Sequence, residues 1–235
     1  MQTKRLQIQG IPAILWGETS SKLFLYIHGQ GGCKEEAEAF AGSEVCRSWQ
    51  VLSIDLPGHG ERKQDTENFV PWQVIPELKT VMDYAEKNWD DCALYANSIG
   101  AWLSMLAFQG KSFSQCLLVS PILDMEKIIL NMMEQAHVTE EHLKQELNIP
   151  TSSGQTLSWA YLEYVRKNPV ENWVSDTQIL FAENDCLTEF SVVSDFILKF
   201  PCCHLTVMKN GEHWFHTKEQ LEYLSSWWTK CLSVS

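Results

Sequence analysis

The alternation of short β-rich runs with longer helical patterns is the feature that most constrains the fold. Amphipathic or apolar stretches, such as residues 70–89 and 99–109, separate the runs. This alternation is typical of a mostly parallel sheet covered by helices, and we expect residues 5–16 to add antiparallel edge strands. The six β-rich runs begin at Leu23, Val51, Cys92, Gln115, Thr177 and Cys203.

One long stretch interrupts the alternation. About fifty residues separate the run ending near Ile122 from the run starting near Thr177, too many for an ordinary connection. We therefore expect a main α/β unit, residues 1–124 and 174–235, and a helical cap inserted at residues 125–173 (the insertion). Its apolar stripes either line a substrate site or pack on the main unit. The candidate substrate contacts are Met132, Met133 and Trp159.

Composition and charge exclude several classes of protein. Hydrophobic residues make up 45% of the 235 residues and charged residues 20%, as in ordinary globular proteins. The formal net charge of -12 disfavours nucleic acids and anionic lipid surfaces as partners. Neither a signal peptide nor an apolar run long enough to span a bilayer is visible. The eight cysteines lack the spacing of metal ligands, so we expect reduced thiols, no metal and a cytoplasmic location.

Ser98 lies in the segment Ala96–Gly100, where a β-rich run meets an apolar helical stretch. A serine nucleophile on a strand-to-helix turn needs small residues two positions before and after it, because the turn presses those positions against neighbouring backbone. Ala96 and Gly100 satisfy this requirement. The pattern also occurs by chance. On this feature alone, Ser98 can be either a nucleophile or an ordinary turn residue.

A glycine-rich segment, His28–Gly32 (HGQGG), follows the first buried run. Glycines there allow backbone N–H groups to turn toward a developing oxyanion. We assign the oxyanion hole to the N–H groups of Gln30 and Ile99, the residue after the candidate nucleophile. The alternative is an ordinary flexible loop.

Carboxylates near the ends of two later runs are candidates for the acid that orients the base. Asp185 follows the run after the insertion and is our choice, whereas Asp124, after the preceding run, is the main competitor. Cys186 adjoins the acid, but no basic neighbour favours its thiolate, so we expect it to pack.

The base is expected between the last run and the last helix, where His213 and His216 both lie. His216 directly precedes Thr217, which together with Gln220 fits a capping box at the helix start. We therefore favour His213 as the base. The helix that follows should bury a stripe at helical spacing, formed by Leu221, Leu224, Trp228 and Cys231.

Together the HGQGG segment, DLPGHGER from Asp55, the turn at Ser98, Asp185 and the segment GEHWF resemble the α/β-hydrolase superfamily. The resemblance covers the chain outside the insertion. It implies an eight-stranded, mostly parallel sheet flanked by helices, with the cap inserted after the sixth strand. It also implies the order nucleophile, acid, base, which Ser98, Asp185 and His213 keep, and structural roles for Asp55 and His59.

These features predict a serine hydrolase of esterase type that acts on a small acyl substrate. Ser98 would attack the acyl carbonyl, His213 would take and return the proton, and Asp185 would orient the imidazole. No cofactor is expected, and the Met and Trp residues of the insertion favour an apolar substrate group. The alternatives are an acyltransferase, thioesterase, amidase or carbon-carbon bond hydrolase with the same three residues, or a noncatalytic ligand-binding protein.

Overall fold

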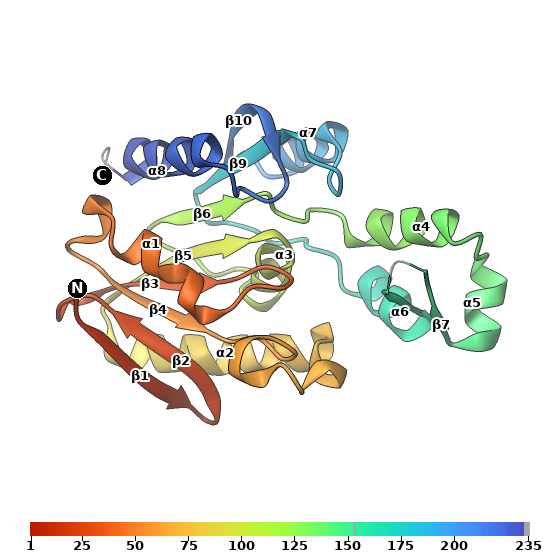
Figure 1. Ribbon diagram of the computed structural model, residues 1–235, viewed down its shortest axis with the longest axis horizontal. Coiled ribbons are helices and arrows are strands. Elements are labelled where there is room, and N and C mark those ends of the chain that lie inside the picture. Colours follow the sequence, from red (N-terminus) through yellow and green to blue (C-terminus); the bar gives the residue numbers. More distant parts are fainter. Residues whose placement is uncertain (153, 233–235) are drawn as a thin grey trace.

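An eight-stranded sheet forms the centre of the computed structural model, which describes residues 1–152 and 154–232 (Figure 1). The strand order is β1-β2-β4-β3-β5-β6-β9-β10. The strands are β1 (Thr3–Ile8), β2 (Ile11–Trp16), β3 (Lys22–Ile27), β4 (Gln50–Ile54), β5 (Asp91–Asn97), β6 (Cys116–Val119), β9 (Thr177–Asn184) and β10 (Cys203–Glu212).

The strand pairings confirm the predicted mixed sheet. β1 and β2 form an antiparallel hairpin, and β2 pairs antiparallel with β4. All pairings from β4 to β10 across the sheet are parallel. The inner strands are buried along nearly their whole length, as parallel strands covered on both faces must be. The carboxyl ends of β3, β5, β6 and β9 therefore meet along one edge of the sheet.

Two layers of helices bury the two faces of the sheet. The longer helices of the main unit are α1 (Ala37–Ala41), α2 (Pro71–Asn88), α3 (Ser98–Ala107), α7 (Phe190–Lys199) and α8 (Lys218–Leu232). Phe40 of α1 and Trp228 of α8 join one apolar cluster, while Val74 of α2, Trp102 of α3 and Phe196 of α7 join the other. Short 3-10 helices occupy Lys34–Glu36, Glu44–Cys46, Gly60–Arg62 and Thr66–Asn68. None of the helices described is long and apolar enough to cross a membrane.

The insertion follows the sixth strand and stands beside the carboxyl edge of the sheet (Figure 1). It contains α4 (Met125–Gln135), α5 (Glu140–Glu146), β7 (Asn148–Pro150), β8 (Thr156–Ser158) and α6 (Trp159–Lys167). The β7–β8 hairpin was not expected, because the sequence predicted a cap made of helices alone. Leu143, Leu157 and Leu162 are buried in an apolar cluster that continues into the main unit.

The last helix begins with the predicted capping box. The Thr217 hydroxyl accepts a hydrogen bond from the Gln220 amide at 3.2 Å, and the Gln220 side chain accepts one from the Thr217 amide at 3.3 Å. Leu224 and Trp228 are buried as expected. The prediction for Leu221 was wrong: its side chain is exposed, because the buried face of α8 runs through Gln220, Leu224, Trp227 and Trp228.

Candidate active site

The turn between β5 and α3 holds Ser98 in a left-handed backbone conformation, with φ of 48°. Such a conformation is unusual for a residue with a side chain and is characteristic of a strained strand-to-helix turn. A Cβ atom at Gly100 would lie 2.3 Å from the His28 carbonyl oxygen, so only glycine fits there. Ala96 is fully buried. The structure thus gives the predicted physical reason for small residues on both sides of Ser98.

Ser98, His213 and Asp185 form a continuous hydrogen-bonded chain. The Ser98 hydroxyl lies 2.8 Å from His213 Nε2, and His213 Nδ1 lies 2.7 Å from Asp185 Oδ2. Because the carboxylate only accepts, His213 Nδ1–H donates to Asp185 and Nε2 is left to accept the Ser98 proton. The sheet brings these residues together from the carboxyl end of β5 and from the loops after β9 and β10.

Backbone amides hold the Asp185 carboxylate in place. Its Oδ1 accepts hydrogen bonds from the amides of Leu187 at 2.8 Å and Thr188 at 2.9 Å. The Thr188 hydroxyl in turn donates to the Pro121 carbonyl at 3.3 Å, tying this loop to the end of β6. The Asp185 side chain is fully buried and that of His213 is 15% exposed. Sequence reasoning did not identify these amide donors, although an aspartate that opens a short turn is a usual signal for them.

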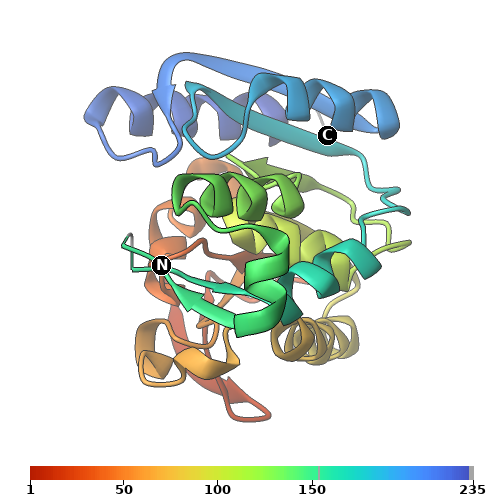
Figure 2. The ribbon, with the colours of Figure 1, turned by 90° about the vertical axis from the view of Figure 1, so that its right-hand side faces the viewer.

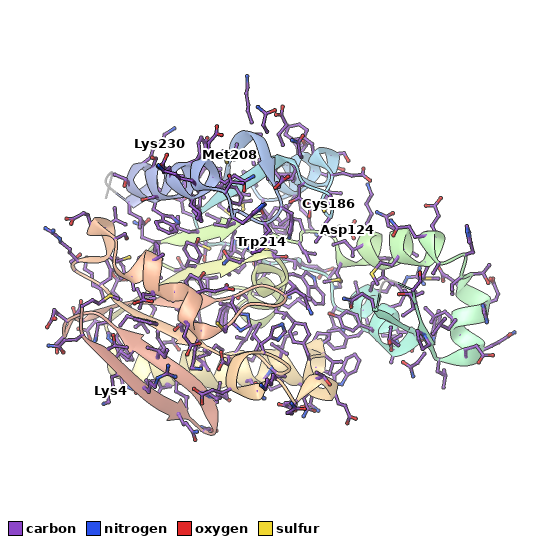
Figure 3. The ribbon with its side chains drawn as sticks, viewed as in Figure 1. Lys4, Asp124, Cys186, Met208, Trp214 and Lys230 are labelled. Carbon is purple, nitrogen blue, oxygen red and sulfur yellow. The ribbon has the colours of Figure 1, made fainter. Side chains whose placement is uncertain are left out.

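The competing carboxylate and histidine have other partners. Asp124 caps the start of α4, where its carboxylate accepts a hydrogen bond from the Lys127 amide at 2.9 Å (Figure 3). His216 Nδ1 lies 2.7 Å from the Trp214 carbonyl oxygen, and its ring stacks on Trp214 at 4.8 Å. The expectation that Cys186 packs was wrong, because this residue is exposed.

The loop between β3 and the first 3-10 helix carries Gln30, and α3 carries Ile99, the second predicted oxyanion donor. A Cβ atom at Gly29 would lie 3.2 Å from Ser98 Cβ, so the loop passes directly beside the serine. Gln30 is at the bend of a turn closed by a hydrogen bond from the Gly32 amide to the Gly29 carbonyl at 3.2 Å. Ile99 lies in the first turn of α3, where backbone amides have no partner within the helix. The assignment of Gln30 and Ile99 to an oxyanion hole remains a prediction.

Both ends of this loop are anchored to the segment after β4. At the start of the loop, His28 Nδ1–H donates to the Gly29 carbonyl and Nε2 accepts from the Leu56 amide at 3.1 Å. Burial lowers the pKa of His28 to about 4, so the ring is neutral at pH 7, as these two bonds require. At the far end, the Lys34 ammonium lies 2.6 Å from Asp55 Oδ2, with the side chains 1% and 0% exposed.

The Lys34–Asp55 pair confers stability at neutral pH. Burial opposes ionisation of both groups, but their mutual hydrogen bonds raise the pKa of Lys34 and lower that of Asp55 below its usual 3.8. The contribution of Asp55 is present above that usual value and is lost as the pH falls through the lower folded-state pKa. Lysine side chains are almost never fully buried unless they are paired. Nothing in the sequence indicated that Lys34 would be buried.

We predict that Lys34→Met lowers the free energy of unfolding by about 3–5 kcal/mol, because Asp55 would remain buried without its counter-ion. Urea denaturation at pH 7 measures this change. The double variant Lys34→Met/Asp55→Asn is the matched control and should regain part of the loss, because asparagine carries no charge and its carbonyl oxygen can still accept from a backbone amide. A single variant as stable as the parent would show that the pair is dispensable for folding.

The three predicted substrate contacts of the insertion lie in different environments. Met133 is 3% exposed and packs in the apolar cluster of the insertion. Met132 and Trp159 are half-buried. The Lys144 ammonium lies over the Trp159 ring, 5.5 Å from the ring centre. Of the three, only Met132 and Trp159 keep part of the side chain accessible to solvent, and their role as substrate contacts remains a prediction.

A cavity of about 310 Å³ lies where the insertion joins the main unit. Its walls come from α3, the start of α4, the end of α6 and α7, and include Trp102, Leu123, Met125, Val170 and Phe196. Ser98 is not among its lining residues. Within the described part of the chain, no group of three or more His, Cys, Asp or Glu side chains is arranged to hold a metal ion.

Comparison with known proteins establishes the fold. The chain resembles Est1E from Butyrivibrio proteoclasticus, solved with ferulic acid bound, with a TM-score of 0.73, 19% identity, and coverage of 98% of this chain and 99% of that one. It also resembles alpha/beta hydrolase domain-containing protein 10 from mouse, with a TM-score of 0.74, 12% identity, and coverage of 100% and 99%. A third similar structure is a soluble variant of monoglyceride lipase from Saccharomyces cerevisiae. Its TM-score is 0.68 and its identity 13%, with coverage of 99% of this chain and 94% of that one.

These similarities, together with the sheet order, show that the chain has the α/β-hydrolase fold, as the sequence predicted. No family model and no curated protein sequence matches the chain.

Proposed function

We propose that the protein is a serine hydrolase that cleaves a carboxylic ester or thioester of a small substrate. The observation that carries this proposal is the hydrogen-bonded chain Ser98–His213–Asp185 at the carboxyl edge of the sheet. Solved structures of the same fold include Est1E, the thioesterase domain of a curacin biosynthetic pathway and a monoglyceride lipase. A cytoplasmic location, expected from the scattered cysteines, is part of the proposal.

In the proposed first half-reaction, Ser98 Oγ attacks the acyl carbonyl while its proton passes to His213 Nε2. The negative charge on the carbonyl oxygen is stabilised by the N–H groups of Gln30 and Ile99. Collapse of the tetrahedral intermediate breaks the bond to the leaving group, which takes the proton from His213 and departs as an alcohol or thiol.

In the second half-reaction, water attacks the acyl-enzyme and gives its proton to His213. Collapse of the second intermediate returns that proton to Ser98 and releases the carboxylic acid. Asp185 holds a proton on His213 Nδ1 at every step, so Nε2 is the nitrogen that takes up and returns the transferred proton.

The test combines labelling with turnover. The protein is treated with a fluorophosphonate and its intact mass is measured, and hydrolysis is then followed with nitrophenyl esters of increasing acyl length. One adduct together with ester hydrolysis supports the proposal. A protein that neither takes the label nor hydrolyses any ester or thioester would contradict it and favour a noncatalytic ligand-binding role.

The insertion is proposed to influence substrate preference without supplying chemistry. Met132→Ala and Trp159→Ala should change the ranking of short against long acyl esters, mainly through KM, because both side chains have accessible surface. Met133→Ala is the matched control, since its buried side chain should lower the stability by about 2–5 kcal/mol and leave the ranking unchanged. Ester profiles and melting temperatures separate the two effects. An unchanged ranking in the first two variants would make the insertion a scaffold.

A further inference from the structure

The carboxylate of Glu36, the last residue of the first 3-10 helix, packs against the glycine-rich loop after β3. A Cβ atom at Gly32 would lie 2.8 Å and 2.9 Å from the two Glu36 carboxylate oxygens and 3.0 Å from the carbon between them. Apart from the chain neighbours of Gly32, these are the described atoms nearest to that position. Although Glu36 as a whole is an exposed residue, its carboxylate therefore lies directly against the Gly32 backbone.

The same carboxylate is hydrogen-bonded to the residue that precedes the 3-10 helix. The Cys33 backbone amide donates to the Glu36 carboxylate, and the Glu36 amide donates to the Cys33 carbonyl at 3.1 Å. A glutamate that reaches back three residues to a backbone amide forms one half of a capping box. Burial raises the pKa of Glu36, although the Cys33 amide favours the charged form. The carboxylate thus ties the end of the glycine-rich loop to the start of the 3-10 helix.

The turn next to this carboxylate carries the predicted oxyanion donor Gln30. A hydrogen bond from the Gly32 amide to the Gly29 carbonyl closes the turn at 3.2 Å, and Gly31 has a left-handed φ of 76°. Glycine on both sides of Gln30 leaves the backbone free to rotate. The direction of the Gln30 N–H group therefore depends on contacts at the two ends of the turn. The Gly29 end passes beside Ser98, and the Gly32 end meets the carboxylate.

An electrostatic interaction also relates Glu36 to the turn that holds the serine. The hydroxyl of the buried Tyr26 accepts a hydrogen bond from Asn97 at 3.0 Å, and Asn97 directly precedes Ser98. Burial raises the pKa of Tyr26, and the neighbouring Tyr95 and Glu36 raise it further. The carboxylate therefore lies near the supports of both turns that surround the candidate nucleophile.

From these contacts we propose that Glu36 is a positioning residue for the oxyanion hole, because its carboxylate fixes the turn that aims the Gln30 amide at the space beside Ser98. This inference rests on the proposed function. Amide donors stabilise a developing oxyanion only when they are held in place before the reaction, and loss of one donor lowers kcat by about 10²- to 10³-fold. A displacement of about 1 Å can cost about 10²-fold. A glutamate that only caps the helix would affect stability and leave kcat unchanged.

The place of the 3-10 helix in the fold separates this effect from substrate binding. The helix continues into α1, which lies on the side of the main unit away from the insertion (Figures 1 and 2). Substitution of Glu36 should therefore spare the substrate contacts predicted in the insertion. The expected signature is a change in kcat with little change in KM.

The first test measures kcat and KM for 4-nitrophenyl acetate, with each rate divided by the fraction of protein that fluorophosphonate labels. Glu36→Ala should lower kcat by about ten- to hundredfold and leave KM within about threefold. Glu36→Gln should keep kcat within about threefold of the parent, because its amide oxygen can still accept from the Cys33 amide. Glu38→Ala is the matched control, since Glu38 is an exposed glutamate of the adjoining helix α1, and it should behave as the parent.

The second test approaches the same contact from Gly32. The φ angle of Gly32 lies outside the left-handed region, so the backbone there accepts alanine. The methyl group of Gly32→Ala would meet the carboxylate at 2.8 to 3.0 Å and displace it, so kcat should fall about as far as in Glu36→Ala. In the Glu36→Ala background the same substitution should change kcat by less than about threefold, because the two changes remove one interaction.

Three results would overturn the inference. They are a parental kcat in Glu36→Ala, a loss in Glu36→Gln as large as that in Glu36→Ala, and an effect of Gly32→Ala that is equal in both backgrounds. A lower melting temperature with an unchanged kcat would make Glu36 a helix cap alone. In each case the proposed function survives if the parent takes one fluorophosphonate adduct and hydrolyses the ester. A parent that fails both assays overturns the proposed function and this inference together.

Discussion

The Ser98→Ala protein is expected to gain no mass on treatment with fluorophosphonate and to lose turnover by about 10⁴-fold or more. The parent should gain one adduct. The reason is that Ser98 Oγ is the atom positioned 2.8 Å from the accepting nitrogen of His213, in a turn that exposes it at the sheet edge. The substitution removes the attacking atom without removing a core contact, so the melting temperature should change little.

Ser104→Ala is the matched control for this experiment. Ser104 lies on the same helix and is fully buried, and its hydroxyl has no hydrogen-bond partner within residues 1–152 and 154–232. Its replacement should leave labelling and turnover at the parental level. Labelling of Ser98→Ala as strong as that of the parent would place the nucleophile elsewhere.

The Asp185→Asn protein is expected to lose turnover by up to about 10⁴-fold while remaining folded. The amides of Leu187 and Thr188 donate to Oδ1, so the asparagine carbonyl oxygen should take that position. Its NH₂ group then points at His213 Nδ1 and forces the ring proton onto Nε2. A protonated Nε2 cannot accept the proton of Ser98, so attack on the substrate becomes slow.

Asp124→Asn provides the comparison for the acid. Asparagine is as good a helix N-cap as aspartate, so α4 should keep its start and the turnover should stay near the parental value. Steady-state rates on one nitrophenyl ester, with melting curves for both variants, decide the matter. A larger loss in Asp124→Asn than in Asp185→Asn would move the acid to Asp124.

Local patterns were sufficient to predict the sheet. Nearly continuous apolar runs such as Leu23–Ile27 can be buried only between two layers of helices, and the alternation with helical stretches selects parallel pairing. The capping box at Thr217 was readable because both partners lie within one turn. Leu221 was misassigned because helical spacing alone does not determine which of two neighbouring faces packs on the sheet.

The candidate site was predictable where chain order specifies position, and not where distant segments meet. Ser98, Asp185 and His213 follow separate strands whose carboxyl ends share one edge, so their approach follows from the topology. The pairing of Lys34 with Asp55 and the stacking of Trp102 on Tyr161 depend instead on how loops and the insertion pack. Such contacts leave no periodic signal in the sequence.

The chain enters the insertion after β6 and leaves it before β9, and Ser98, Asp185 and His213 all lie outside it. Evolution can therefore replace or remodel residues 125–173 in a single exchange while the hydrogen-bonded chain keeps its supports. The same separation offers a practical graft point for chimeric proteins, with exchange boundaries at the end of β6 and the start of β9. Helices α2, α3 and α7 would then need matching surface residues. Trp72 and Trp102 meet the Tyr161 ring. Lys127 pairs with Glu189, just before α7, and Lys199 of α7 donates to the Val170 carbonyl.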